Sequence, residues 1–303
     1  MRSHPPDAER LINLDFPLDL RRTLEPLAHG RGDPTLRLSG AEAWLAFRTP
    51  DGPATLHLNH LRTDAIAVHA WGSGAEPALA GAERLIGTDD DPAAFEPRHR
   101  LLHELQRRFR GLRLTASGRP FDALLPTVLE QKVTGIEARA SYRRLIHCHG
   151  EPAPGSFGLR LPPDAVKLAA LPYYAYHPLG VERRRADVIR RAAAVAPRLQ
   201  AATSSAAAQA VMGPLAGIGP WTIAEVARNA YGDPDAISVG DYHLPHIVAW
   251  ALAGEARATD ERMLDLLEPY RGQRARVQRL LEVSGIQPPR YGPRMTPRNI
   301  AAI

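Results

Sequence analysis

The sequence predicts a mainly α-helical protein that carries a small α+β sheet domain at its N-terminus. Short runs of alternating apolar and polar residues, bounded by turn-forming residues, crowd roughly the first 90 positions. From about residue 97 onward, apolar residues recur at helical spacing almost throughout. The stretch 88–92 (Thr-Asp-Asp-Asp-Pro) separates the two patterns. We therefore expect an α+β sheet domain at 1–92 and a helical region at 93–303.

The elements of the N-terminal domain follow from this alternation. Strands are predicted at 35–39, 43–48, 54–59 and 65–71, and the sequence Thr-Pro-Asp-Gly-Pro at 49–53 predicts a turn. A helix is predicted at 75–86.

The helical region begins with a strong apolar stripe. One helical face holds Phe121, Leu124, Leu125, Val128 and Leu129. Further helices are predicted at 136–147, around the apolar positions of 181–195, at 220–230 and at 272–283.

Composition and charge limit the classes of function. No run approaches the ~18 apolar residues of a membrane span, and the N-terminus lacks the apolar core of a signal peptide, so we expect a cytoplasmic protein without a membrane partner. A single cysteine, Cys148, cannot form an internal disulfide or hold an iron–sulfur cluster, and we expect it to be buried.

The charge is unevenly distributed along the chain. Residues 1–100 hold 11 Arg and no Lys against 15 acidic residues, a net charge of −4, whereas residues 101–303 hold 27 basic and 18 acidic residues, a net of +9. A basic second part indicates a polyanionic partner, although charge alone does not establish one.

Residues 215–222 (Leu-Ala-Gly-Ile-Gly-Pro-Trp-Thr) predict a turn that opens a helix. Gly217 and Gly219 permit conformations closed to other residues and allow a close approach to the backbone. Pro220 suits the first helical turn, and the N-terminus of that helix presents free N–H groups to an anion. We therefore predict a docking site for a DNA phosphate in a hairpin at about 206–231. A plain helical corner is the alternative.

An aspartate follows this hairpin at a distance of one helix and one loop. Asp241 precedes a further predicted helix, so it can serve as a helix cap. A capping carboxylate has a fixed orientation and can still face a groove, so a catalytic role is compatible with capping.

These features together resemble a known family. The hairpin sequence, the segment Gly-Asp-Pro-Asp-Ala at 232–236 and Asp241 resemble the helix-hairpin-helix DNA glycosylases that have a Gly/Pro-rich loop and a catalytic aspartate. Within that family the chain is most similar to the bacterial 3-methyladenine DNA glycosylase II group, over roughly residues 97–285. The resemblance implies a helical bundle of two lobes. It also matches the segment from Phe121 to Thr134, which holds Gln131 and Lys132, to the one that enters the DNA minor groove opposite a flipped base.

The resemblance also implies a reaction. Asp241 would stabilise the positive charge that develops on the sugar as the bond to the base breaks. Trp221 stands where family members that also cut the backbone place a lysine, so we expect a monofunctional enzyme. The residues assigned to the substrate pocket are Trp221, Tyr242 and Glu225, and those assigned to DNA contact are Gly217, Gly219, Thr222, Gln131 and Lys132.

Three departures put the preferred base in question. Lys132 occupies the position of the apolar or Gln wedge, Glu225 replaces an aromatic residue, and the predicted helix 272–283 lacks a pocket tryptophan. We expect damaged, in particular alkylated, purines in double-stranded DNA. The alternatives are a glycosylase for oxidised or deaminated bases and a non-catalytic DNA-binding protein, which would have no need of Asp241.

The sequence indicates no metal site, because its close histidine pairs lack further ligands at a suitable spacing. No cofactor is expected, apart from a monovalent cation at the hairpin that the resemblance alone implies. We expect a monomer.

Overall fold

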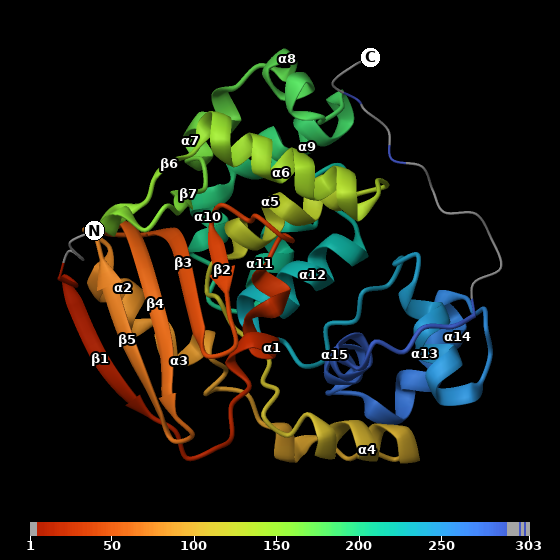
Figure 1. Cartoon of the computed structure of the whole chain (residues 1–303). Helices are drawn as coiled ribbons and strands as arrows, with labels where there is room; N and C mark the ends of the chain where they lie inside the picture. The colour runs from red at the N-terminus through yellow and green to blue at the C-terminus, as the bar shows by residue number, and fades with distance from the viewer. Residues whose placement is uncertain (1–4, 290–296, 298–299, 301–303) are drawn as a thin grey trace.

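The computed structural model describes residues 5–289, 297 and 300. An antiparallel sheet lies on one side of the molecule, and two groups of helices lie beside it (Figure 1). The larger group follows the sheet directly, and the smaller group, with α4 (Arg100–Arg108) at its lower edge, closes the opposite side (Figure 1). The mainly helical class and the small N-terminal sheet are as predicted. The domain boundary at residue 92 stays a prediction.

The sheet has five strands in the order β1-β5-β4-β3-β2, with every neighbouring pair antiparallel. The four predicted strands are confirmed within a few residues, and β1 was not predicted. This edge strand buries only Ala8 and Ile12, so its sequence shows no alternation. The strands are β1 (Ala8–Asn13), β2 (Leu36–Leu38), β3 (Glu42–Thr49), β4 (Gly52–Arg62) and β5 (Ala65–Trp71).

One face of the sheet packs against three short helices. The predicted helix at 75–86 is divided at Gly81 into α2 (Ala75–Ala80) and α3 (Ala82–Leu85). These helices bury Leu79, Leu85 and neighbouring apolar side chains against the sheet. The remaining elements of this part are α1 (Leu20–Leu24) and the 3₁₀ helices η1 (Glu25–Leu27) and η2 (Pro92–Ala94).

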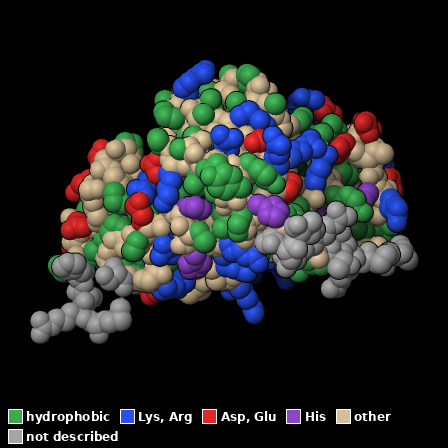
Figure 2. Space-filling view, turned by 90° about the horizontal axis from the view of Figure 1, so that it is seen from above, with side chains coloured by type: hydrophobic (Ala, Val, Ile, Leu, Met, Phe, Trp, Pro, Cys, Tyr) green, Lys and Arg blue, Asp and Glu red, His purple; other side chains and the backbone are tan. Residues whose placement is uncertain are grey.

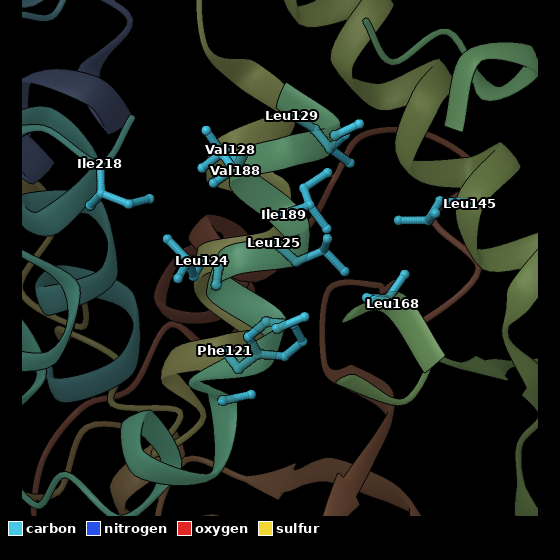
Figure 3. Packing of buried hydrophobic residues seen from close by; sticks show 14 of the residues in the cluster. Phe121, Leu124, Leu125, Val128, Leu129, Leu145, Leu168, Val188, Ile189 and Ile218 are labelled. Carbon is cyan, nitrogen blue, oxygen red and sulfur yellow. The ribbon is translucent and has the colours of Figure 1, made fainter. Parts of the chain in front are cut away.

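The larger helical group has its core around the predicted apolar stripe of α5. Phe121, Leu124, Leu125, Val128 and Leu129 are all buried, and they contact side chains from several other helices (Figure 3). The elements are α5 (Pro120–Glu130), α6 (Gly135–His149), β6 (Glu151–Pro152), η3 (Pro154–Ser156), β7 (Arg160–Leu161), α7 (Ala165–Ala170), α8 (Tyr173–Tyr176), η4 (His177–Leu179), α9 (Arg183–Ala194), α10 (Ala196–Gln200), α11 (Ser205–Met212) and α12 (Pro220–Tyr231).

The smaller helical group has a separate core. Leu102, Val248, Leu267 and Leu281 are buried in it. Within the described residues, no helix is both long and apolar enough to cross a membrane. The elements are α4 (Arg100–Arg108), α13 (Leu244–Ala253), α14 (Asp260–Leu267), η5 (Glu268–Tyr270) and α15 (Arg274–Ser284).

One expectation about a single side chain was wrong. Cys148 is exposed near the C-terminal end of α6, although we expected it to be buried.

Arg185 of α9 is only 1% exposed. Its guanidinium group donates to the carbonyl oxygens of Leu129 and Gly180. Arg185 therefore fixes the C-terminal end of α5 against the start of α9.

Candidate active site

A pocket of about 280 Å³ opens where the sheet domain and both helical groups meet. This volume is close to the lower end of the range that holds small ligands, which suits a compact ring system. We call it the central pocket. It is lined by Glu25, Pro26, Glu130, Trp221, Glu225, Arg228, Asn229, Asp241, Leu244, Ile247, Gln278, Arg279 and Glu282.

Asp241 lies in the central pocket with both carboxylate oxygens engaged. Oδ1 accepts hydrogen bonds from the backbone N–H groups of His243 (2.7 Å) and Leu244 (2.8 Å), at the start of α13. Oδ2 accepts a hydrogen bond from the indole Nε1 of Trp221 at 3.2 Å. Asp241 therefore caps a helix and at the same time presents a carboxylate of fixed orientation to the pocket.

Glu225 also lines the central pocket, but its carboxylate belongs to an ionic network. Its Oε1 accepts hydrogen bonds from Arg228 at 2.9 Å and from the hydroxyl group of Ser238. Arg228 also donates to both oxygens of Glu282, at 2.9 Å each. Burial alone disfavours a charged Arg228, yet the two glutamates raise its pKa. Burial likewise works against a charged Glu282, yet Arg228 and Arg279 lower its pKa.

Glu130 is a pocket residue that the sequence analysis did not identify. It is the last residue of α5, open to solvent at the pocket but crowded by protein on its other sides. Burial, together with the negative charges of Glu225 and Asp241, raises the pKa of its carboxyl group to about 7, although the positive charge of Arg139 acts to lower it. An acid at the C-terminus of a helix is opposed by the helix dipole, and that mismatch was the available signal in the sequence.

The hairpin joins α11 to α12, and α12 begins at Pro220 as predicted. Gly217 has φ +93°, and a Cβ atom there would lie 2.4 Å from Val188 Cγ2. Gly219 has φ −116°, and a Cβ atom there would meet nothing within 4 Å. Ile218 between them is buried and points into the core toward Val128 and Val188 (Figure 3). The fold therefore requires a glycine at position 217, whereas Gly219 leaves the backbone open to close approach from outside.

The loop between α5 and α6 is tied to this hairpin through Gln131. Its Nε2 donates to the carbonyl oxygen of Gly217 and to Thr222 Oγ1, each at 3.0 Å. The next residue, Lys132, is exposed and has φ +56°, the one positive φ outside glycine among the described residues. Strain of this kind persists only where the surroundings impose it, and it is concentrated at functional sites.

The structure brings together some of the predicted site residues and not others. Trp221, Glu225 and Asp241 all line the central pocket. Tyr242 does not line it: the ring is 80% exposed and lies edge-on to His243, with centroids 4.9 Å apart. Thr222 is buried and holds Gln131, so its hydroxyl group is already engaged. Besides Glu130, the sequence analysis missed Arg228, which lies three residues after Glu225 on α12. It also missed Glu25, Gln278 and Glu282, which reach the pocket from distant parts of the chain.

Some of the charges that make the sequence asymmetric form ion pairs inside the protein. Arg276 and Arg279 of α15 are buried and pair with the acidic residues Asp90 and Glu25 of the N-terminal part. Over the face seen in Figure 2, Lys and Arg side chains lie mostly toward the middle and acidic ones mainly toward the two sides. The basic surface is therefore smaller than the sequence count indicates, but this face keeps a basic centre.

The described residues contain no group of three or more side chains that could hold a metal ion. For the cation implied at the hairpin, two of the backbone carbonyl groups are already engaged: Ala216 accepts from Arg191 at 2.9 Å and Gly217 from Gln131. These two carbonyl groups therefore do not fit the ligand set of a cation, and the proposed reaction does not involve such an ion.

Comparison with known proteins identifies the fold but no sequence family. No model of a known protein family matches the sequence, and a search of curated proteins finds no relative. Solved structures do match. A 3-methyladenine DNA glycosylase from Archaeoglobus fulgidus is 15% identical, with a TM-score of 0.76 over 90% of this chain and 97% of its own.

Two further structures extend the comparison. The apo form of an 8-oxoguanine glycosylase/lyase from Clostridium acetobutylicum is 10% identical, with a TM-score of 0.67 over 93% of this chain and 99% of its own. A 3-methyladenine DNA glycosylase from fission yeast, solved with abasic DNA, is 16% identical, with a TM-score of 0.51 over 62% of this chain and 93% of its own. The chain therefore has the fold of the helix-hairpin-helix DNA glycosylases, as the sequence predicted.

Proposed function

We propose that this protein is a monofunctional DNA glycosylase of base excision repair. The observation that carries the proposal is the position of Asp241, which lies in the central pocket with its carboxylate held by Trp221 and by the start of α13. A non-catalytic DNA-binding protein would need the hairpin but no oriented carboxylate in a pocket. The structural neighbours, which act on DNA bases by name, support the same class.

The proposed reaction is hydrolysis of the bond between a flipped base and its sugar. A base must leave the stack before this bond is accessible, at a cost of a few kcal/mol. The bond electrons leave with the base, and the sugar acquires oxocarbenium character that the Asp241 carboxylate stabilises. A water molecule then adds to the sugar carbon and releases a proton, which Asp241 is placed to accept. The product is an intact strand with an abasic site.

Docking on double-stranded DNA is assigned to the hairpin and the neighbouring loop. The open backbone at Gly219, at the N-terminus of α12, is suited to a phosphate. Gln131 holds this hairpin beside Lys132, whose exposed side chain would enter the gap left by the flipped base. We further propose that the protein acts as a monomer in the cytoplasm.

The substrates we propose are alkylated purines such as 3-methyladenine and 7-methylguanine. Such bases carry positive charge, and a cation is attracted to an aromatic face such as that of Trp221. Their bonds to the sugar are already weakened, so one carboxylate in a small pocket is sufficient.

The test is release of bases from matched duplexes that carry 7-methylguanine, hypoxanthine, uracil or 8-oxoguanine. Release of alkylated purines by the wild type, and loss of release in Asp241→Asn, is the expected result. A protein that binds these duplexes but releases no base would be a non-catalytic DNA-binding protein. A clear preference for 8-oxoguanine or a deaminated base would support the second class of glycosylase.

A further inference from the structure

The central pocket has an excess of negative charge, although the chain as a whole has a net charge of +5. Two guanidinium groups line it, and three carboxylates share them. Arg228 pairs with Glu225 and Glu282, and Arg279 pairs with Glu282 and Glu25. These two cations are already outnumbered by their own partners. Asp241 and Glu130 add two further carboxylates to the same pocket.

Glu130 differs from the other four carboxylates. Across the part of the chain that the structure describes, its carboxyl group forms neither a hydrogen bond nor an ion pair. It also lines a second, adjoining pocket of about 130 Å³, which shares Pro26, Glu225 and Asn229 with the central one. Glu130 therefore stands at the junction of two cavities with its acceptor oxygens unused.

This arrangement is unfavourable in the free protein. Burial and the like charges of Glu225 and Asp241 both oppose ionisation of Glu130, and the C-terminal end of α5 opposes it again. A positively charged ligand in the pocket would offset these penalties by direct attraction to the carboxylate. A neutral ligand would leave the repulsion in place and add to the desolvation.

We infer that Glu130 is a specificity-determining residue that selects bases carrying a positive charge over neutral ones. The inference rests on the proposed glycosylase function and deepens it, since it names the residue that favours cationic, N-alkylated purines. Glu130 acts by direct attraction to the ring or by accepting a hydrogen bond from its edge. Asp241 keeps its role at the sugar.

The selection depends on pH because Glu130 must be ionised to provide it. As the pH rises through about 7, Glu130 loses its proton and the pocket gains a negative charge. The preference for a cationic base therefore increases across neutral pH. The charged groups that act on Glu130 are Glu225 of α12, Arg139 of α6 and Asp241 before α13. Other charged or titratable groups around the two pockets include Glu25, Arg228, Arg279 and Glu282 in the central one and His29, Arg119 and Asp122 in the second.

The test compares wild type with Glu130→Gln under single-turnover conditions, from about pH 5.5 to 8.5, a range that brackets the Glu130 pKa of about 7. The substrates are duplexes with 7-methylguanine, which is cationic, and with hypoxanthine, which is neutral. The measured quantity is the ratio of wild-type to variant rate for each base, which cancels any pH response that the two proteins share. For 7-methylguanine we expect this ratio to rise at least about fivefold across the range, since one nearby charge is involved. For hypoxanthine we expect it to stay flat or to fall.

Two controls separate the possible failures. Glu130→Asp keeps the charge and should restore the pH response. Glu104→Gln, which changes an exposed glutamate of α4, should behave as wild type. A flat ratio for both bases would overturn the inference while leaving the glycosylase assignment intact. A ratio that is largest for hypoxanthine at low pH would also overturn it, because Glu130 would then act as a proton donor. If the wild type releases no base at all, the proposed function itself is overturned.

Discussion

The indole N–H group of Trp221 donates a hydrogen bond to Asp241 Oδ2 at 3.2 Å, on the carboxylate oxygen that does not cap α13. The ring thus lines the central pocket and also fixes the rotation of the carboxylate beside it. This link gives Trp221 a use at the position where, by the resemblance of the sequence, glycosylases that also cut the backbone carry a lysine. It supplies orientation in place of a nucleophile.

Replacing Trp221 with Phe tests this link directly. The substitution keeps an aromatic wall and removes the N–H donor. A hydrogen bond to a charged group contributes about 1.5–3 kcal/mol, and water access at this half-buried site reduces that value. We expect single-turnover base release to fall about tenfold, with DNA affinity unchanged. An unchanged rate would mean that the two amide donors at the start of α13 are sufficient to orient Asp241.

Asp241→Asn removes the charge and keeps the size of the side chain. Its Oδ1 can still accept from the amide groups of His243 and Leu244, so the cap and the fold should survive. We expect base release to fall by several orders of magnitude, while DNA binding stays within a few-fold of wild type. A variant within about tenfold of the wild-type rate, or ~1.4 kcal/mol, would exclude Asp241 as the residue that stabilises the sugar cation.

The fold was predictable where sequence periodicity was strong. The α5 stripe and strand β5 bury regularly spaced apolar side chains, so their sequences show the pattern directly. Strand β4 buries Ala54 to Leu58 in succession, but its sequence still alternates apolar and polar residues there. Strand β1 escaped prediction because an edge strand buries only two of its residues. The division of one predicted helix into α2 and α3 depends on how Gly81 packs, which composition does not reveal.

The candidate site was predictable only where it is local in sequence. The hairpin and Asp241 lie within one segment, and the structure places them as the pattern indicated. The negative charge of the pocket depends on Glu25, Glu130 and Glu282, which come from three distant parts of the chain. Closeness in sequence to Asp241 was, in contrast, a poor guide to which residues line the pocket. Tyr242 follows Asp241 directly, but its side chain is exposed to solvent outside the pocket lining.

Gly219→Ala and Gly217→Ala form a matched pair at the hairpin. An added Cβ at Gly219 has open space around it and an ordinary φ, so the fold should tolerate it. The methyl group would obstruct a docked phosphate, and we expect DNA affinity to fall roughly fivefold, about 1 kcal/mol, for all sequences alike. If a folded Gly219→Ala variant binds DNA normally, the hairpin is only a helical corner and not a phosphate-binding site.

Gly217→Ala is the contrasting member of the pair. Its positive φ and the approach to Val188 predict a loss of stability, so weaker binding by this variant would not identify a phosphate contact. We expect a lower melting temperature for Gly217→Ala and an unchanged one for Gly219→Ala, measured by thermal unfolding followed by circular dichroism. Equal melting temperatures would contradict the packing described here.

The absence of a lysine at position 221 predicts an enzyme that leaves the DNA strand intact. Borohydride reduction during turnover traps a covalent adduct only where an amine attacks the sugar. We expect no adduct with the wild type. Lys132 is the exposed amine of the loop beside the hairpin, so Lys132→Arg is the relevant control. Trapping that disappears in Lys132→Arg would show that this loop supplies a nucleophile and that the enzyme is bifunctional.

The buried pair of Asp90 and Arg276 predicts that the N-terminal part and the C-terminal helix unfold together. Both side chains are at most 5% exposed, and Asp90 also accepts from the backbone N–H of Leu114 at 3.1 Å. Removing one member leaves the other charged and unpaired in the interior, so Asp90→Ala and Arg276→Met should each cost about 3–5 kcal/mol.

The double variant decides whether this pairing is the cause of those losses. Without either charge the interior holds no unpaired ion, so we expect the loss in Asp90→Ala/Arg276→Met to be clearly smaller than the sum of the single losses. Urea unfolding followed by tryptophan fluorescence measures all four proteins under the same conditions. Additive losses would mean that Asp90 acts through the amide group of Leu114, and that α15 is held by its apolar face and by its other polar contacts, such as those of Arg279 and Glu282.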